Sequence, residues 1–307
     1  MKEAERQGID VGATLACLGT LLCWSVGPIF IKLLSGFVDL WTQNLLRYLV
    51  ACLFWLPFLL LQRSKENFNH KVWSRSILPA AANIFLQSFW AASFYYIGPA
   101  LMSLLVKSSV IWIAGFSLIF FPAERGLVRS KRFWSALVLS MVGVTGVILS
   151  GGAFTSEATA KGILLTMLAA FGWAVYSILA KISFRNIDVR LGFSVTSIYT
   201  VAGLGLLAII FGKPGMSFEM TTSGWVYVVV SGIVSIAVSH VLYYAAMKRI
   251  GATIPALVLL GTPFLVFSIS RVVFGETLSL LQCVFGAVLL LGCGISIWAQ
   301  GDLAVNR

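Results

Sequence analysis

Ten apolar stretches occupy almost all of the 307 residues of this chain. A helix needs about 20 predominantly apolar residues to cross the roughly 30 Å hydrocarbon core of a bilayer, and most of the stretches reach that length. They cover residues 11–34, 38–62, 76–97, 99–121, 133–150, 160–182, 191–211, 223–247, 252–274 and 277–299. The longest polar connection, residues 63–75, is too short for a soluble domain. The sequence therefore predicts an all-α polytopic membrane protein with 10 transmembrane helices.

Composition and charge support a membrane location. Hydrophobic residues make up 59% of the chain and charged residues 11%, whereas soluble domains have about 25% charged residues. The net charge of +11 would suit a nucleic-acid-binding protein, but the basic residues gather in every second connection between the spans. That distribution follows the positive-inside rule. We therefore expect no nucleic-acid partner. The protein is expected to be a multi-pass protein in the lipid bilayer of the plasma (bacterial inner) membrane, with cytoplasmic N- and C-termini.

The second half of the chain repeats the first. The aligned pairs, at offsets of 149 and then 153 residues, are Trp24 with Trp173, Lys32 with Lys181, and Gly98 with Gly251. We place the first repeat, with helices 1–5, at residues 1–152 and the second, with helices 6–10, at residues 153–307. Because five is an odd number, the second repeat enters the membrane in the opposite sense. Such inverted repeats are typical of secondary transporters that bind substrate between the two halves.

Several short motifs resemble those of the drug/metabolite transporter superfamily, in its ten-helix form with two EamA domains. They are Trp24…Lys32 and Trp173…Lys181 in the first helix of each half, Arg47-Tyr48, Gly261-Thr262-Pro263, and the span-ending Glu124 and Glu276. The resemblance covers about the whole chain. One departure is that Ser109-Val110 stands in the fourth helix where the ninth has Thr262-Pro263, so the first half lacks the family's proline kink.

The resemblance implies a central cavity lined by helices 1–4 and 6–9, and it makes Thr262 a candidate substrate contact. Helices 5 and 10 are then peripheral and are expected to form a homodimer contact. Relatives in this superfamily export amino acids, including aromatic ones, and other small metabolites. Related branches move nucleotide sugars or sugar phosphates.

Two cations lie deep in predicted spans. Arg47 is about ten residues into the second span and Lys107 about nine into the fourth, with no Asp or Glu at similar depth. A charge inside the bilayer costs at least about 2.5–3.5 kcal/mol and marks a functional candidate. We expect both cations to bind a substrate carboxylate or phosphate; the alternative is a structural role, with carbonyl groups or water as partners.

Aromatic residues and one histidine are the remaining candidates for substrate binding. Trp24 and Trp173 occupy equivalent mid-helix positions. We expect each of them to contact the substrate or, alternatively, to pack against the other repeat. Phe89 and Trp90 lie in an aromatic-rich third span and are expected to wall the cavity. His240 in the eighth span either contacts substrate or bridges helices by a hydrogen bond.

Charged residues nearer the ends of the spans have simpler explanations. Lys32 and Arg271 are expected to extend to the membrane interface. Glu124 and Glu276 are expected to cap a helix or to pair locally, with Arg125 and Arg271 respectively.

These features favour a secondary transporter of amino acids or related anionic or zwitterionic metabolites, working by alternating access in export or exchange. The alternative is an exchanger of sugar phosphates or nucleotides; a channel or a membrane-embedded enzyme fits less well. The five cysteines contain no CxxC pair, and His70 lies in a loop away from His240, so we expect no metal and no cofactor. No phosphate-binding GxxxxGK[ST] loop is present for primary transport.

Overall fold

The computed structural model describes residues 10–65, 68–120, 130–150, 157–250, 255 and 258–305, and its regular elements are all helical. The first half contains α1 (Val11–Leu34), α2 (Leu40–Arg63), α3 (Lys71–Ser93), α4 (Pro99–Leu105), the 3₁₀ turn η1 (Val106–Ser108), α5 (Ser109–Phe120) and α6 (Lys131–Ser150). The second half contains α7 (Glu157–Ser183), α8 (Val189–Phe211), the 3₁₀ helix η3 (Pro214–Glu219), α9 (Thr222–Val230), the π-helix η4 (Ser231–Val238), α10 (Ser239–Ile250), the 3₁₀ turn η5 (Leu259–Gly261), α12 (Thr262–Phe274) and α13 (Leu280–Val305).

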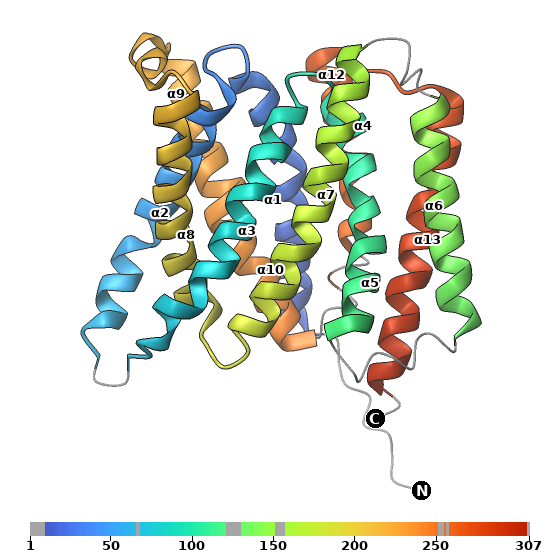
Figure 1. Ribbon diagram of the computed structural model, residues 1–307, viewed down its shortest axis with the longest axis horizontal. Helices are drawn as coiled ribbons and strands as arrows, with labels where there is room; N and C mark the ends of the chain where they lie inside the picture. Colours follow the sequence, from blue (N-terminus) through green and yellow to red (C-terminus); the bar gives the residue numbers. More distant parts are fainter. Residues whose placement is uncertain are drawn as a thin grey trace, which may run out of the picture.

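The described helices form a bundle whose members cross from one end to the other (Figure 1). Seven described helical segments are long and apolar enough to cross a membrane, and two further apolar helices, Leu259–Phe274 and Leu280–Ser296, are shorter. The predicted all-helical, multi-pass membrane architecture is therefore confirmed.

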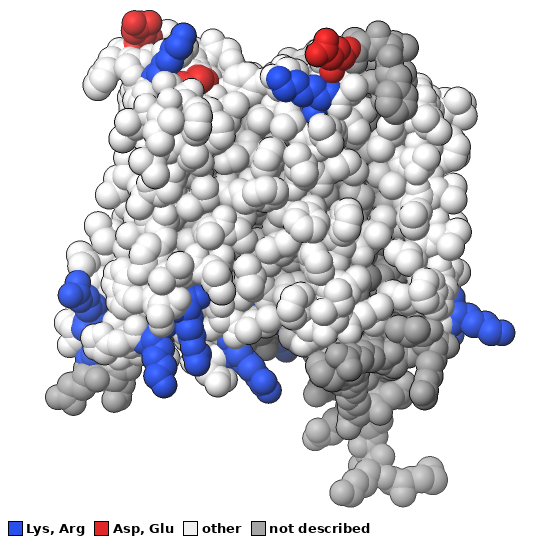
Figure 2. Space-filling model, in the orientation of Figure 1, with Lys and Arg blue, Asp and Glu red and all other residues white. Residues whose placement is uncertain are grey.

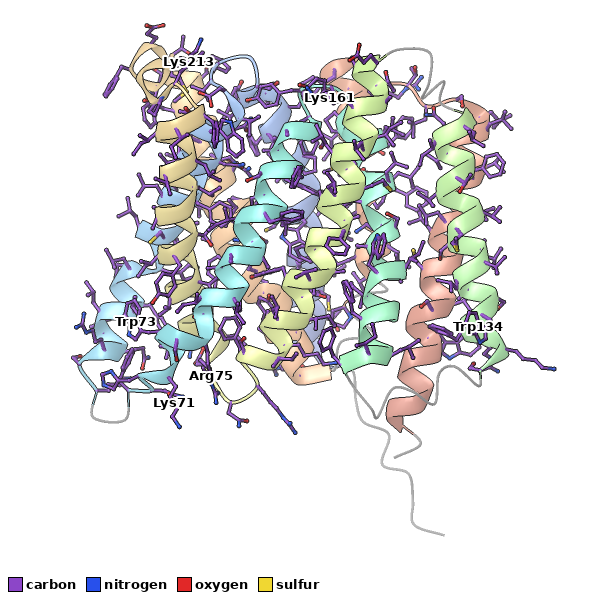
Figure 3. All side chains as sticks on the ribbon, in the orientation of Figure 1. Lys71, Trp73, Arg75, Trp134, Lys161 and Lys213 are labelled. Carbon is purple, nitrogen blue, oxygen red and sulfur yellow. The ribbon has the colours of Figure 1, made fainter. Side chains whose placement is uncertain are left out.

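The two halves run in opposite directions. Lys161, near the start of α7, and Lys213, after α8, lie at the upper end in Figure 3, whereas Lys71 at the start of α3 and Trp134 in α6 lie at the lower end. The backbone N–H of Lys213 donates to Asp39, which precedes α2 (2.9 Å), so α1 ends at the upper end. Thus α1 runs upward and α7 downward, as an inverted repeat requires.

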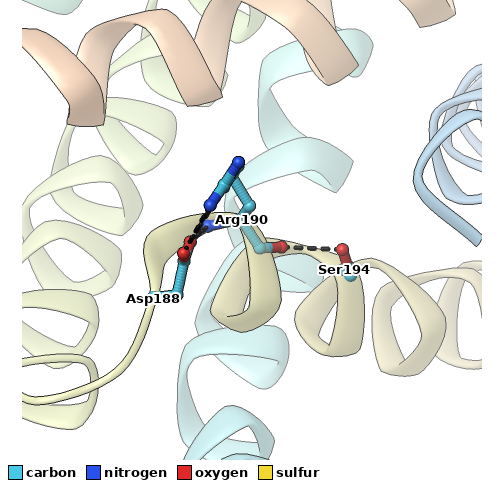
Figure 4. Close-up of polar contacts among 3 residues, drawn as sticks. All are labelled: Asp188, Arg190 and Ser194. Atoms are coloured by element: carbon cyan, nitrogen blue, oxygen red, sulfur yellow. Dashed lines mark hydrogen bonds and ion pairs between the residues drawn. The ribbon is translucent and has the colours of Figure 1, made fainter. Parts of the chain in front are cut away.

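Aspartates begin both second helices, at positions 149 residues apart. Asp39 accepts hydrogen bonds from the backbone N–H groups of Trp41 (2.9 Å) and Thr42 (3.1 Å) at the start of α2. Asp188 caps α8 through the N–H of Arg190 (2.8 Å) and also pairs with its guanidinium (Figure 4). Burial raises the pKa of Asp39, but the Thr42 hydroxyl and three backbone N–H groups outweigh it, so its net pKa is lowered. These caps supply partners for N–H groups that a helix leaves free.

Helices α6 and α13 form a pair at one side of the bundle (Figure 1). A Cβ atom on Gly143 of α6 would lie 2.4 Å from the backbone nitrogen of Leu289 in α13. Small residues let helix backbones approach closely in membranes, where packing rather than burial drives association. Gly143 therefore sets the distance between these two helices.

We expect Gly143→Val to force α6 and α13 apart, because the obstructing atoms belong to the backbone of Leu289. Overpacking of about 1–3 kcal/mol corresponds to a thermal midpoint lower by roughly 2–10 °C, measured on purified protein. Gly115→Val in α5 is the matched control, since nothing lies within 4 Å of a Cβ there. Equal shifts for the two variants would contradict the packing role of Gly143.

Candidate functional site

A cavity of about 190 Å³ lies between the two halves of the bundle. Its lining comes from the first half through Trp24, Gly27, Pro28, Ile31, Arg47, Leu86, Gln87, Trp90, Ser103, Val106, Lys107, Ser109, Val110 and Ile113. The second half contributes Trp173, Ser235, Ile236, His240, Tyr243, Leu259, Leu260 and Thr262. No Asp or Glu is among these described lining residues. Arg47 and Lys107 are the Arg and Lys side chains of the lining, and no lining carboxylate balances their charge.

Arg47 of α2 reaches the cavity across the interface between the repeats. Its Nε donates to the Ser231 hydroxyl of η4 (3.1 Å), and only 3% of the residue is exposed. Within the described chain its Nη1 is buried without a hydrogen-bond partner. A buried guanidinium donor that lacks an acceptor is costly, and an anion in the cavity would supply one.

Lys107 enters the cavity from a break in the helix. It lies in the 3₁₀ turn η1 between α4 and α5, and the corresponding turn η5, 153 residues later, precedes Thr262 and α12. Short 3₁₀ stretches inside a helix often mark functional hinges. The first half therefore has the same interruption as the second although Val110, not proline, follows Ser109. Leu260 stands at the position that corresponds to Lys107, so the cation belongs to the first half alone.

The aromatic wall of the cavity joins the two repeats. Trp24 and Trp173 meet edge to face with ring centroids 5.5 Å apart. Trp24 also contacts His240 at 5.6 Å and Tyr243 at 5.0 Å. The two expectations for these tryptophans are therefore compatible, because both residues pack across the repeat interface and both line the cavity.

His240 is the second residue of α10. Its Nδ1 lies 2.8 Å from the carbonyl oxygen of Ile236, and its ring stacks on Phe193 at 5.1 Å. Ile236 belongs to η4, which continues directly into α10, so this hydrogen bond joins two turns of one continuous helix. In the described chain His240 therefore does not bridge separate helices through a hydrogen bond.

The structure brings seven of the eight predicted site residues to one cavity: Trp24, Arg47, Trp90, Lys107, Trp173, His240 and Thr262. Phe89 is not among the lining residues; its ring packs against Phe85 at 4.6 Å, in a cluster around Leu86 and Tyr176. The Thr262 hydroxyl donates to the carbonyl of Leu259 in η5 (2.8 Å). Substrate contact by any of these residues stays a prediction.

Sequence reasoning missed Ser231, Ser235 and Tyr243. Ser231 holds Arg47, while Ser235 and Tyr243 line the cavity. The spacings of Ser231 and Ser235 from His240 do not follow the period of an α-helix, so a search for a 3.6-residue repeat places them on other faces. Tyr243 follows His240 by three residues in α10 and shares its face, so helical spacing from His240 could have found it.

Lys32 and Glu276 bind other helices at the upper end of the bundle. Lys32 Nζ donates to the carbonyl oxygen of Phe94 at the C-terminal end of α3 (2.6 Å), a contact between helices that the sequence did not predict. Glu276 accepts from the backbone N–H groups of Ala100 (2.9 Å) and Leu101 (3.2 Å) and from the Ser270 hydroxyl. The expected cap exists, but on α4 of the other half rather than locally. Glu124 lies outside the described residues.

Comparison with known proteins places both halves of the chain in one family of sequences. Residues 11–149 and 160–298 each match the EamA-like transporter family. An uncharacterized transporter of Bacillus subtilis is 28% identical over 221 residues, which span 68% of this chain and 69% of the relative. An uncharacterized transporter of Methanothermobacter thermautotrophicus is 27% identical over 203 residues, which span 64% of this chain and 56% of the relative. A protein of known crystal structure matches with a TM-score of 0.64 at 20% identity, over 92% of this chain and 96% of that one.

Proposed function

This chain belongs to the EamA-like transporter family, and we propose that it is a secondary transporter that moves small organic anions or zwitterions by alternating access. The observation that carries the proposal is Arg47, a buried cation at the cavity with Nη1 unpartnered in the described chain. A carboxylate or phosphate would accept from this nitrogen and balance its charge.

Lys107 strengthens the case for an anion. It lines the same cavity as Arg47, and no Asp or Glu is among the described residues that line it. Two cations that share a site repel each other, and a bound anion turns that repulsion into attraction, more strongly in a medium of low dielectric constant. Trp24, Trp90, Trp173, His240 and Thr262 complete the proposed binding site, with Phe89 behind it.

Alternating access would follow from the inverted repeats. Two structurally similar halves can exchange conformations, so one sequence provides both outward-open and inward-open states. The hinges proposed for this exchange are η1 and η5, which interrupt corresponding helices beside the cavity. The proposed repeat boundaries remain residues 1–152 and 153–307.

Flux through liposomes tests the proposal. The purified full chain would be reconstituted with a panel of radiolabelled amino acids, other carboxylates, nucleotides and sugar phosphates. Saturable uptake of carboxylates or amino acids is expected, and stimulation by the same solute inside the liposome would indicate exchange. Selective uptake of phosphorylated solutes would favour the sugar-phosphate or nucleotide alternative. Flux that does not saturate would contradict a carrier.

We further propose 10 membrane spans in the plasma (bacterial inner) membrane, with both termini cytoplasmic. On the face drawn in Figure 2, Lys and Arg side chains lie along the lower rim without Asp or Glu beside them, whereas the upper rim carries Asp and Glu together with Lys161 and Lys213. Under the positive-inside rule the lower end is cytoplasmic.

A cysteine-labelling experiment checks this orientation. In a variant whose five native cysteines are replaced, Lys213→Cys at the upper end should react with a membrane-impermeant thiol reagent added to whole cells. Lys71→Cys at the lower end should react only after the membrane is opened (Figure 3). The reverse pattern would overturn the proposed topology.

We propose a homodimer through the outer surfaces of α6 and α13. Val138 on α6 is 59% exposed, and Leu291 on α13 is 64% exposed. Oxidation of Val138→Cys in native membranes should give a crosslinked dimer, whereas Leu206→Cys on α8, also 59% exposed, should not. Equal crosslinking at both positions would argue against a specific contact.

A further inference from the structure

The π-helix η4 aligns polar groups that an ordinary α-helix would separate. An α-helix turns by about 100° per residue, so His240, nine residues after Ser231, would lie about 180° away on the opposite face. The wider turns of a π-helix, closed by i→i+5 hydrogen bonds, bring Ser231, Ser235 and His240 toward one face. The contacts agree, because Ser231 holds Arg47 while Ser235 and His240 both line the cavity.

Side chains stabilise this unusual segment. Trp55 of α2 donates its indole N–H to the carbonyl of Ala237 (2.9 Å), and His240 donates to the carbonyl of Ile236 (2.8 Å). Gly232 lets η4 approach α2, since a Cβ atom there would lie 2.7 Å from the carbonyl oxygen of Arg47. Helical segments of this kind occur frequently at functional sites.

Two groups on this face are candidates for contact with a bound solute. Ser235 and His240 are 6% and 5% exposed, and the Ser235 hydroxyl oxygen is buried without a hydrogen bond in the described chain. With Nδ1 engaged by Ile236, Nε2 of His240 is the nitrogen left for the cavity. The neutral ring carries its proton on Nδ1, which makes Nε2 an acceptor. An imidazolium would add a third unpaired cation beside Arg47 and Lys107, so the neutral ring is favoured.

We propose that Ser235 and His240 form a second, neutral pole of the binding site, which accepts a hydrogen bond from a hydroxyl or N–H group of the bound solute. This inference rests on the proposed function, because the first pole is the carboxylate site at Arg47. The solute is therefore an organic acid that carries a hydrogen-bond donor in addition to its carboxylate.

The spacing of the poles indicates where that donor lies. Ser231, which holds Arg47, and His240 are at most about 13.5 Å apart along the helix axis, at 1.5 Å per residue. A solute that meets Arg47 and His240 together has its carboxylate and its donor at opposite ends. Trp24 contacts both His240 and Trp173, so an apolar or ring-bearing body between the two ends would pack on this wall.

The repeat supports a cavity-facing role for this position. At the offset of 153 residues, the counterpart of His240 is Gln87 in α3, and both residues line the cavity. Gln87 is placed there by a continuous α-helix, whereas His240 needs the π-helical segment before it. The two halves thus present different polar groups from equivalent positions.

Two probes that differ by one hydroxyl group test the proposal: 3-phenylpropanoate and 3-(4-hydroxyphenyl)propanoate. Their affinities for the purified full chain in lipid nanodiscs would be measured by calorimetry. The wild type should bind the hydroxylated probe about five- to tenfold more tightly, the effect of about one net hydrogen bond. His240→Phe should bind the two probes equally, so the readout is the ratio of the two affinities within each variant. His70→Phe, at the loop before α3, is the matched control and should behave as wild type.

The outcomes separate this inference from the proposed function. Equal binding of the two probes by the wild type, or a preference retained in His240→Phe, would overturn the second pole alone. Arg47→Gln should lower the affinity for both probes by the same factor. An unchanged affinity in Arg47→Gln would contradict the anion site, independently of the result for His240→Phe. A wild type that binds neither probe contradicts both. If His240→Phe does not fold, Ser235→Ala replaces it in the test. This smaller change should reduce the preference for the hydroxylated probe.

Discussion

Arg47→Gln is expected to weaken binding of 3-phenylpropanoate by about 10- to 100-fold, the loss associated with a hydrogen bond to a charged group. Arg47 is 3% exposed and its Nη1 is unpartnered in the described chain, so the solute carboxylate would be its counter-charge. Glutamine still reaches the Ser231 hydroxyl but carries no charge. Calorimetry on protein in nanodiscs measures the change.

Related variants separate charge from geometry. Arg47→Lys should recover only part of the affinity, because the planar fork that binds a carboxylate through two hydrogen bonds is lost. Lys107→Gln should also weaken binding. Arg190→Gln is the matched control, since Arg190 is half-exposed and pairs with Asp188 at the lower end of the bundle. Unchanged affinity in both Arg47→Gln and Lys107→Gln, with the protein folded, would make these cations structural.

The sequence was sufficient for the features that depend on hydrophobicity and repetition. Apolar length predicted the membrane helices, and an odd number of spans per repeat predicted opposite directions, now seen in α1 and α7. The cost of a charge in the bilayer selected Arg47 and Lys107, which the structure brings to one cavity. Each of these inferences uses a property of single residues or of their order.

Features that depend on tertiary contacts could not be predicted in this way. The register of η4 follows from contacts such as Trp55 with Ala237, which lie 182 residues apart. The 3₁₀ turn η1 forms without the proline whose absence suggested an unbroken helix in the first half. Glu276 ends one helix in sequence but caps another in space. These partners are far apart in the sequence, so the periodicity of apolar residues does not predict them.

Glu276 joins the two halves at the upper end of the bundle. It lies between α12 and α13, and it accepts from Ala100 and Leu101 at the start of α4. A carboxylate at the N-terminus of a helix is stabilised by the free N–H groups and by the helix dipole. A Cβ atom on Gly98 would lie 2.3 Å from a Glu276 oxygen, so the glycine makes room for the cap. Opening of the upper end between α4 and α12 would have to break these hydrogen bonds.

Glu276→Gln is therefore expected to favour opening at the upper end. The amide has one acceptor oxygen, and its NH₂ group would face backbone N–H donors, so at least one charge-assisted hydrogen bond worth about 1.5–3 kcal/mol is lost. That loss corresponds to an opening equilibrium shifted by at least about tenfold. Ser103 lies four residues into α4 and lines the cavity, so Ser103→Cys reports the opening.

The measurement is the rate at which a membrane-impermeant thiol reagent, added at the upper side, modifies Ser103→Cys in a background without native cysteines. Glu276→Gln should raise this rate about tenfold or more. Glu219→Gln is the matched control, because Glu219 is an exposed acid at the end of η3, at the same end of the bundle. A rate that is unchanged in Glu276→Gln, or raised equally in Glu219→Gln, would show that the cap stabilises α4 without controlling access to the cavity.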